Sequence, residues 1–276
     1  MKLLFLMLNL YFQADTLQAY LQKLDPEIRV SMAVHDAKGH LLFGLNDSIS
    51  VASASVIKIP ILMEFIFQLE AKKIKLKDEY RLKNEDKVGG SGNLQFEAEG
   101  KVFTLEELAT AMIAVSDNVA TNILIDKLGA DNINEMLKYH GWQKTQLNRK
   151  MMDFKAILQG KQNYTNVIEI NEMLQKALSK QLFSRKIGKK FIEILLKCED
   201  VNTIPRHFSK QIPIAHKSGT LDYIRGDAGI IFGKSPLILS IFIENFVTIE
   251  QAEHIIGNLA YLADMQFGGL DMKMVK

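Results

Sequence analysis

Ser55 and Lys58 are the first pair of side chains whose types and spacing could do chemistry. In a helix that begins near Ser55, positions three apart share a face, so the amine of Lys58 would lie beside the hydroxyl of Ser55. A serine hydroxyl becomes a good nucleophile when a neighbouring base takes its proton, and a lysine shielded from water can be that base. The alternative interpretation is structural, with Ser55 as a helix cap and Lys58 as a solvated side chain.

Two later polar stretches could serve the same chemistry. The triplet SDN at 116–118 interrupts an apolar helical run and brings a second hydroxyl to the junction of two helices. The stretch KSGT at 217–220 ends an apolar strand with a cation, two hydroxyls and a glycine. A strand edge there offers N–H groups to an oxyanion, and glycine lets a ligand approach the backbone closely. Taken singly, each stretch is also ordinary cap or turn chemistry.

Together, and in this chain order, Ser-x-x-Lys, Ser-Asp-Asn and Lys-Ser-Gly form a motif set typical of class A β-lactamases and penicillin-binding proteins. The chain resembles this family over about residues 15–267, most specifically in SDNVATNILIDKLG and KSGT. The resemblance implies an α+β fold of the β-lactamase/transpeptidase type. That fold has a five-stranded antiparallel sheet flanked by helices, an all-helical lobe, and the active site in the cleft between them.

The resemblance also implies a role for each matching residue. Ser55 would be the acylated nucleophile, and Lys58 would be its base or proton relay. Ser116 would pass a proton to the departing nitrogen. Asn118 would orient the side-chain amide of the substrate and hold Lys58.

On the strand, Lys217 would supply positive potential, and with Ser218 and Thr220 it would bind the carboxylate of the substrate. The backbone N–H groups of Ser55 and Thr220 would form the oxyanion hole, with Gly219 allowing the close approach. The implied partner is a small-molecule β-lactam or a peptidoglycan stem peptide.

One loop departs from the family pattern. Class A β-lactamases carry Arg-x-Glu-x-x-x-Asn there, and the glutamate activates the water that hydrolyses the acyl-enzyme. In LNRKMMDFKAILQG, Arg149 aligns, but Met151 takes the glutamate position and Lys155 the asparagine position. Deacylation without a general base should be slower by about 10²–10⁴-fold. Asp153 could substitute if the loop is reshaped; otherwise it pairs with Arg149 or caps the following turn.

The predicted function is therefore β-lactam ring opening through an acyl-Ser55 intermediate, with slow deacylation. The alternatives are a D-alanyl-D-alanine carboxypeptidase, a penicillin-binding or sensor protein that stays acylated, or an esterase that uses the same serine and lysine. Penicillin-binding carboxypeptidases that otherwise resemble class A enzymes also lack the glutamate.

The composition of the chain argues against several other classes of function. The 276 residues are 47% hydrophobic, enough for a sizeable core, and the net charge of +2 does not favour a nucleic-acid partner. The single cysteine, Cys198, rules out an intrachain disulfide and a cysteine metal cluster. The histidines lack ligand spacing, and His216 is expected to be structural. We expect no metal, no cofactor, no stable membrane span and a monomer.

The pattern along the chain predicts a lobe built from both ends of the sequence. Residues 1–14 resemble a signal peptide, which predicts export to the periplasm or the exterior. Residues 15–48 and 205–267 would form an α/β lobe, residues 49–204 a helical lobe, and 268–276 a tail. The expected strands are 28–36, 40–44, 212–218, 227–232 and 237–243, and the expected helices are 15–24, 55–72, 105–115, 119–128, 131–140, 167–180, 184–197 and 249–265, with loops at 73–100 and 145–166.

Overall fold

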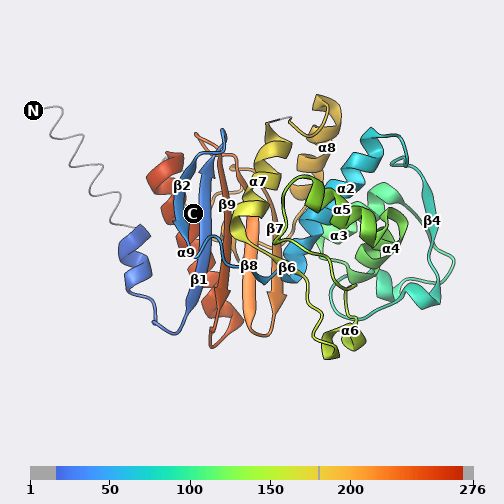
Figure 1. Ribbon diagram of the computed structural model, residues 1–276, viewed down its shortest axis with the longest axis horizontal. Helices are drawn as coiled ribbons and strands as arrows, with labels where there is room; N and C mark the ends of the chain where they lie inside the picture. The colour runs from blue at the N-terminus through green and yellow to red at the C-terminus, as the bar shows by residue number, and fades with distance from the viewer. Residues whose placement is uncertain (1–16, 180, 270–276) are drawn as a thin grey trace, which may run out of the picture.

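The computed structural model describes residues 17–179 and 181–269. The expected signal peptide, 1–14, and the tail beyond residue 269 lie outside the described residues. A sheet built from the two ends of the chain stands beside a group of helices built from its middle (Figure 1).

The main sheet has five strands in the order β2-β1-β9-β8-β7, and every neighbouring pair is antiparallel. Its first and last parts meet where β1 pairs with β9, from Arg29 opposite Glu244 to Asp36 opposite Leu237. The predicted α+β fold with a five-stranded antiparallel sheet is therefore confirmed. The strands are β1 (Arg29–Asp36), β2 (Leu41–Leu45), β7 (Ile214–Leu221), β8 (Ile224–Ile231) and β9 (Leu237–Glu244).

Alternating side chains of the sheet enter two different cores. In β1, Val30 and Met32 join a cluster with α9 (Ile249–Ala263), whereas Ala33 belongs to the cluster that includes the helices of the middle segment. This alternation follows from the two-residue period of a strand. The helix over 17–22 packs into the first cluster, and α7 (Val167–Leu178) covers the opposite face of the sheet.

The helices of the middle segment follow the predicted pattern closely. A capping box between Thr104 and Glu107 opens α3, and Gly129, with φ of +88°, ends α4. The segment contains α2 (Lys58–Glu70), α3 (Leu105–Ala114), α4 (Asn118–Leu128), α5 (Ala130–Tyr139) and α8 (Arg185–Leu195). None of the helices that the structure describes is long and apolar enough to cross a bilayer.

The helix at Ser55 differs from the prediction. Ser55 lies in a 3₁₀ turn, η1 (Ala54–Ile57), and the α-helix begins at Lys58 and ends at Glu70 rather than 72. Pro60 is thus the third residue of α2, where its missing N–H costs no intrahelical hydrogen bond.

The two expected loops contain short regular elements that are too brief to show a period in sequence. Residues 73–100 include β4 (Glu79–Arg81), which pairs with β5 (Val102–Thr104), and two 3₁₀ turns, η2 (Asn84–Asp86) and η3 (Leu94–Phe96).

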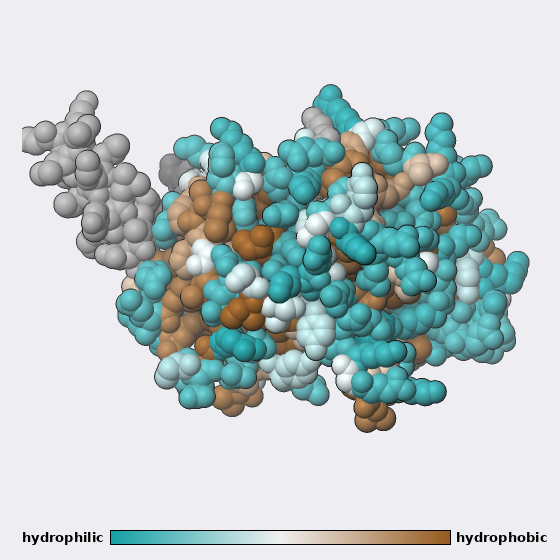
Figure 2. Space-filling model, viewed as in Figure 1, coloured by the Kyte–Doolittle hydropathy of each residue, from teal (hydrophilic) through white to brown (hydrophobic). Residues whose placement is uncertain are grey.

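The second loop, 145–166, includes α6 (Phe154–Leu158) and β6 (Tyr164–Thr165). Strand β6 pairs with β3 (Val51–Ala52), directly before Ser55, so this loop is tied to the segment that carries the serine. Phe154 and Leu158 are exposed on α6, and Figure 2 shows hydrophobic side chains projecting at the lower edge of the molecule in the region of this helix.

Two further short elements lie near the end of the chain. They are η4 (Ile204–His207) and η5 (Asp264–Gly268), the latter being a π-helical turn that follows α9.

Candidate active site

Ser55 is held where the strand β7 presses against the turn η1. Gly219 of β7 lies so close that a Cβ on it would stand 2.6 Å from the backbone nitrogen of Ser55 and 2.9 Å from that of Val56. Only glycine permits this approach. Ala54, directly before the serine, has φ of +46°, a left-handed conformation that L residues seldom adopt. The Ser55 backbone N–H is therefore fixed against the end of the strand.

Lys58 forms a compact group with the second predicted motif. Its Nζ lies 2.8 Å from the carbonyl oxygen of Ser116, 2.9 Å from the Ser116 hydroxyl oxygen and 3.2 Å from Oδ1 of Asn118. We expected Lys58 to lie beside the hydroxyl of Ser55. Among the described residues, however, no hydrogen bond joins these two side chains. Lys58 instead meets the polar groups at the α3–α4 junction.

Burial changes the protonation of Lys58. The side chain is fully buried, and this desolvation, together with the nearby charge of Lys217, holds the pKa of Lys58 well below that of a free lysine; Asp117 opposes the shift. A buried amine with a lowered pKa can exist in the neutral form and accept a proton.

The α3–α4 junction is shaped by Asp117 and by the glycine-rich loop GGSG at 89–92. Ser116 has φ of +56°, and the buried carboxylate of Asp117 caps α4 by accepting from the N–H of Ala120. Its other oxygen accepts from the N–H of Leu94. A Cβ at position 92 would stand 2.2 Å from the Asp117 carboxylate, so Gly92 is required for this packing. The glycine-rich loop therefore borders the site.

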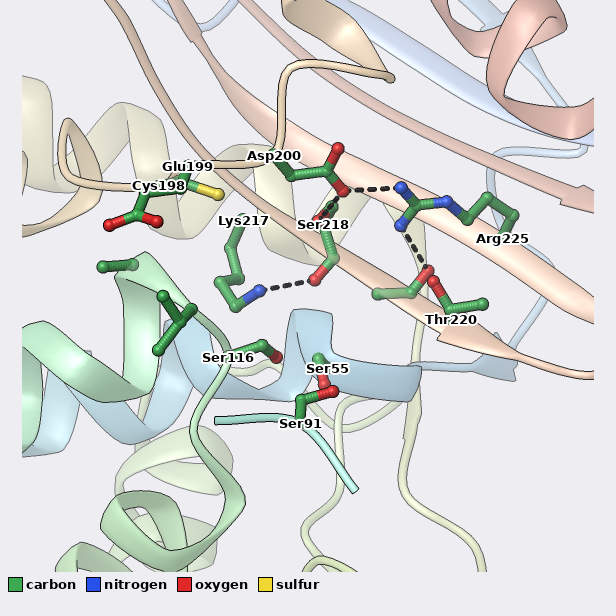
Figure 3. Close-up of a pocket in the computed structure, with 13 residues that line it drawn as sticks. Ser55, Ser91, Ser116, Cys198, Glu199, Asp200, Lys217, Ser218, Thr220 and Arg225 are labelled. Carbon is green, nitrogen blue, oxygen red and sulfur yellow. Dashed lines mark hydrogen bonds and ion pairs between the residues drawn. The ribbon is translucent and has the colours of Figure 1, made fainter. Parts of the chain in front are cut away.

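Lys217 lies on the other wall. It is buried, and its Nζ donates to the carbonyl oxygen of Ser218 at 2.7 Å (Figure 3). Burial lowers its pKa, although Cys198, Asp227 and Asp200 act in the opposite direction.

One cavity of about 290 Å³ brings most of the predicted residues together. Ser55, Ser116 and Lys217 line it, with 218–220 of the same strand. Lys58 and Asn118 do not line the cavity, but both are held at Ser116. All eight predicted residues thus belong to one continuous group.

The cavity is also lined by Ser91, from the glycine-rich loop, and by four residues that sequence reasoning missed: Cys198, Glu199, Asp200 and Arg225. Arg225 lies opposite Thr220 in the β7–β8 register. The two-residue turn between these strands could have revealed it, because a hairpin fixes which residues are cross-strand neighbours. Asp200 comes from an irregular segment and carried no comparable signal.

Asp200 and Arg225 form a partly buried ion pair at one end of the cavity. Oδ2 of Asp200 lies 2.5 Å from the guanidinium of Arg225 and accepts from the hydroxyl of Ser218 at 2.6 Å. Burial acts to raise the pKa of Asp200, but the charge of Arg225 and the Ser218 hydrogen bond outweigh it and lower that pKa to about 2. The carboxylate is therefore ionised at any neutral or mildly acidic pH.

His216 lies beside Lys217 but does not line the cavity. Its Nδ1 is 2.9 Å from a carboxylate oxygen of Asp227, and both side chains are buried. Burial acts to lower the pKa of His216, but Asp227, with smaller contributions from Cys198, outweighs it and raises that pKa to about 10. The contact fits the structural role expected for this histidine.

The loop around Met151 is held through its backbone. Asn122 of α4 receives the N–H of Met151 on its Oδ1 and donates to the Met151 carbonyl oxygen. Asp153 caps α6 by accepting from the N–H of Ala156 at 2.9 Å, and Arg149 donates to Gln162. Of the roles considered for Asp153, the structure shows the cap.

No group of three or more His, Cys, Asp or Glu side chains within residues 17–179 and 181–269 is arranged to hold a metal ion.

Comparison with known proteins gives a consistent result. The chain matches the model of the beta-lactamase enzyme family over residues 13–265. Among solved structures it is similar to a β-lactamase from Sphaerobacter thermophilus DSM 20745, with 26% identity, 95% of this chain and 98% of that chain covered, and a TM-score of 0.83.

Two further structures share the fold. PBP-A has 22% identity with 95% and 97% of the two chains covered and a TM-score of 0.83. A representative of class A β-lactamase from Bacteroides cellulosilyticus DSM 14838 has 19% identity with 94% and 98% covered and a TM-score of 0.83. No curated protein matches the chain.

Proposed function

The chain belongs to the beta-lactamase enzyme family of serine hydrolases, and on that premise we propose that it opens β-lactam rings through an acyl-Ser55 intermediate. The observation that carries this proposal is the contact of a fully buried amine, Lys58, with the Ser116 hydroxyl, at a cavity shared by Ser55 and Lys217.

Lys58 is proposed as the base. A neutral amine has two hydrogens, which the backbone carbonyl oxygen of Ser116 and the side-chain Oδ1 of Asn118 can accept, and one lone pair. This lone pair is available to take the Ser55 proton, directly or through the Ser116 hydroxyl. The Ser55 oxygen then attacks the lactam carbonyl carbon, and the carbon–nitrogen bond breaks. Ser116 hands its proton to the departing nitrogen and regains one from Lys58.

The oxyanion of the tetrahedral intermediate is proposed to bind between the backbone N–H groups of Ser55 and Thr220. The close approach at Gly219 supports this role, because it brings the end of β7 against the backbone of Ser55. Lys217 would add positive potential in the cavity, and Asn118 would orient the substrate amide while it holds Lys58.

Deacylation is proposed to be slow. The side chain of Met151 has no group that can take a proton from water, and it is 7% exposed within the helical core. The nearest acid in sequence, Asp153, is engaged in capping α6. Loss of a general base typically slows a step that depends on it by about 10²–10⁴-fold.

The same observation favours a second candidate function. A slowly deacylating enzyme would act as a D-alanyl-D-alanine carboxypeptidase or as a penicillin-binding sensor, and the solved structures similar to this chain include PBP-A and a PBP-A mutant as an acyl-enzyme complex with penicillin G. We also propose export directed by residues 1–14, which detection of the mature protein in a periplasmic or culture fraction would support.

Intact-mass spectrometry with benzylpenicillin, sampled from seconds to hours, tests the function. An adduct that appears and clears as penicilloate accumulates supports a β-lactamase. An adduct that persists, together with release of D-alanine from a D-alanyl-D-alanine peptide, supports the carboxypeptidase. A persistent adduct without peptide cleavage supports the sensor, and absence of both adduct and penicilloate contradicts all three.

A further inference from the structure

The end of the cavity at Ser218 and Arg225 already holds a carboxylate of the chain itself. Figure 3 shows the Asp200 side chain directed at both residues. One oxygen, Oδ2, receives the Ser218 hydroxyl at 2.6 Å and lies 2.5 Å from the Arg225 guanidinium. These are a hydroxyl and a guanidinium of the kind that bind a ligand carboxylate, and Asp200 occupies them.

This carboxylate is anchored rather than free to turn away. Its other oxygen, Oδ1, accepts the backbone N–H of Asn202 at 3.0 Å. All of its strong contacts are thereby made within the chain. A ligand carboxylate at this position would have to displace Asp200 from Ser218 and Arg225. It would then bind only the two groups that Asp200 had bound.

The charges around the cavity also disfavour an anion at this end. Arg225 is 5% exposed and is paired with two carboxylates, Asp200 and Glu253, the latter at 2.9 Å. Lys217 is the other cation that lines this end, and exposed Glu199 stands at the rim. The two cations are thus matched by two buried or half-buried acids, so this end of the cavity carries little net attraction for an anion.

We propose that Asp200 is a specificity-determining residue that disfavours a substrate carboxylate at the Ser218–Arg225 end and selects an uncharged hydrogen-bonding group there, such as a carboxamide. A carboxamide N–H could donate to Asp200 while its carbonyl oxygen accepts from the cations. This inference rests on the proposed acylation of Ser55. It identifies the chemical class of substrate that the site takes.

The first test uses the wild-type protein with three compounds: benzylpenicillin, its methyl ester and its carboxamide. Intact-mass spectrometry gives the rate constant for acylation by each compound, and hydrolysis by hydroxide corrects for the intrinsic reactivity of each ring. After this correction, the carboxamide should acylate at least as fast as the acid. An acid that reacts about tenfold faster than both neutral compounds would overturn the inference.

The second test is Asp200→Asn, which keeps the shape of the side chain and removes its charge. The ratio of acid to carboxamide acylation rates should rise by about tenfold or more, because Arg225 is then free to bind the acid. Glu199→Gln is the matched control, since it removes one charge at the rim but no contact with Ser218 or Arg225. Its ratio should stay within about twofold of wild type.

The outcomes separate the two claims. An adduct whose acid-to-carboxamide ratio is the same in wild type, Asp200→Asn and Glu199→Gln overturns the inference and leaves the proposed function standing. A ratio that rises equally in both variants assigns the effect to general charge and also overturns it. If no compound forms an adduct, the proposed function fails and the inference fails with it. Should Asp200→Asn not fold, the wild-type comparison decides alone.

Discussion

Nζ of Lys58 lies 2.9 Å from the hydroxyl oxygen of Ser116, although the two residues are 58 positions apart in sequence. The first residue of α2 and the junction of α3 and α4 meet at this contact. Burial of the amine there lowers its pKa, and the same contact connects it to a hydroxyl that lines the cavity. The proposed base, Lys58, and the proposed proton carrier, Ser116, are therefore in direct contact.

The acylation rate should depend on the neutral form of Lys58. Because its pKa is lowered, the rate should rise with pH through that lowered value and reach a plateau well below the usual lysine value of 10.5. Lys58→Arg should lower acylation by about 10²–10⁴-fold, since arginine stays protonated. Stopped-flow measurement with a chromogenic cephalosporin reports the rate. The control is Lys127→Arg, at an exposed position of α4, which should behave as wild type.

Gly219→Ala should separate β7 from Ser55. The added Cβ would meet the backbone nitrogens of Ser55 and Val56 at 2.6 and 2.9 Å, so the strand or the turn must move. Displacing one oxyanion donor costs about 10²–10³-fold in rate. The matched control is Gly188→Ala in α8, where the new Cβ makes ordinary contacts of 3.5 and 3.7 Å. Acylation at the wild-type rate in Gly219→Ala would contradict the proposed oxyanion site.

The His216–Asp227 pair should make stability depend on pH. The folded-state pKa of His216 is raised from the 6.5 of an ordinary histidine to about 10. The stabilisation is then fully present below about pH 6.5 and is lost as the pH rises toward 10. Thermal unfolding should show a difference between wild type and Asp227→Asn that shrinks over this window.

The size of that difference provides the check. Breaking a buried pair by removing one partner typically costs about 3–5 kcal/mol. Asp126→Asn, which removes the exposed pair with Lys150, should change stability by at most about 1 kcal/mol at any pH. Asp227 also accepts from the hydroxyl of Thr203 and the N–H of Ile204, and these contacts contribute at any pH. A difference between wild type and Asp227→Asn that stays constant from pH 6.5 to 10 would therefore show that His216 is not charged in the folded protein.

Met151→Glu should accelerate loss of the acyl group. A carboxylate at this buried position could take a proton from the attacking water, and a gain of about 10²-fold in deacylation is expected. In Met151→Gln the side chain has the shape of glutamate without its charge, so deacylation should stay slow. Both variants place a polar group among buried apolar side chains, so the midpoint of thermal unfolding should fall in each. Identical deacylation in the two variants would rule out the proposed reason for slow release.

Much of this site could be predicted from the sequence because its residues sit in short motifs at element ends. The capping box at Thr104, the stop at Gly129 and the β-branched strands fixed the neighbouring helices and the sheet. The three motifs then had to meet where those elements meet. The order of helices and strands along the chain likewise predicted the fold.

The remaining features depend on tertiary contacts that leave no local pattern. Nothing in the sequence near Asp200 connects it with Arg225, because an irregular segment and a strand edge meet only in the fold. The hydrogen bonds of Lys58 to Ser116 and Asn118, rather than to Ser55, result from a 3₁₀ turn preceding α2. Such a turn shares the apolar spacing of the helix that follows it and so escaped prediction.

The most direct test of the central claim maps the acyl group itself. Wild type and Ser55→Ala are incubated with a fluorescent penicillin, digested, and the labelled peptide is sequenced by mass spectrometry. The account predicts a single labelled peptide that contains Ser55 in wild type and no label in Ser55→Ala, with both proteins folded by circular dichroism. Label on another residue, or label retained in Ser55→Ala, would contradict it.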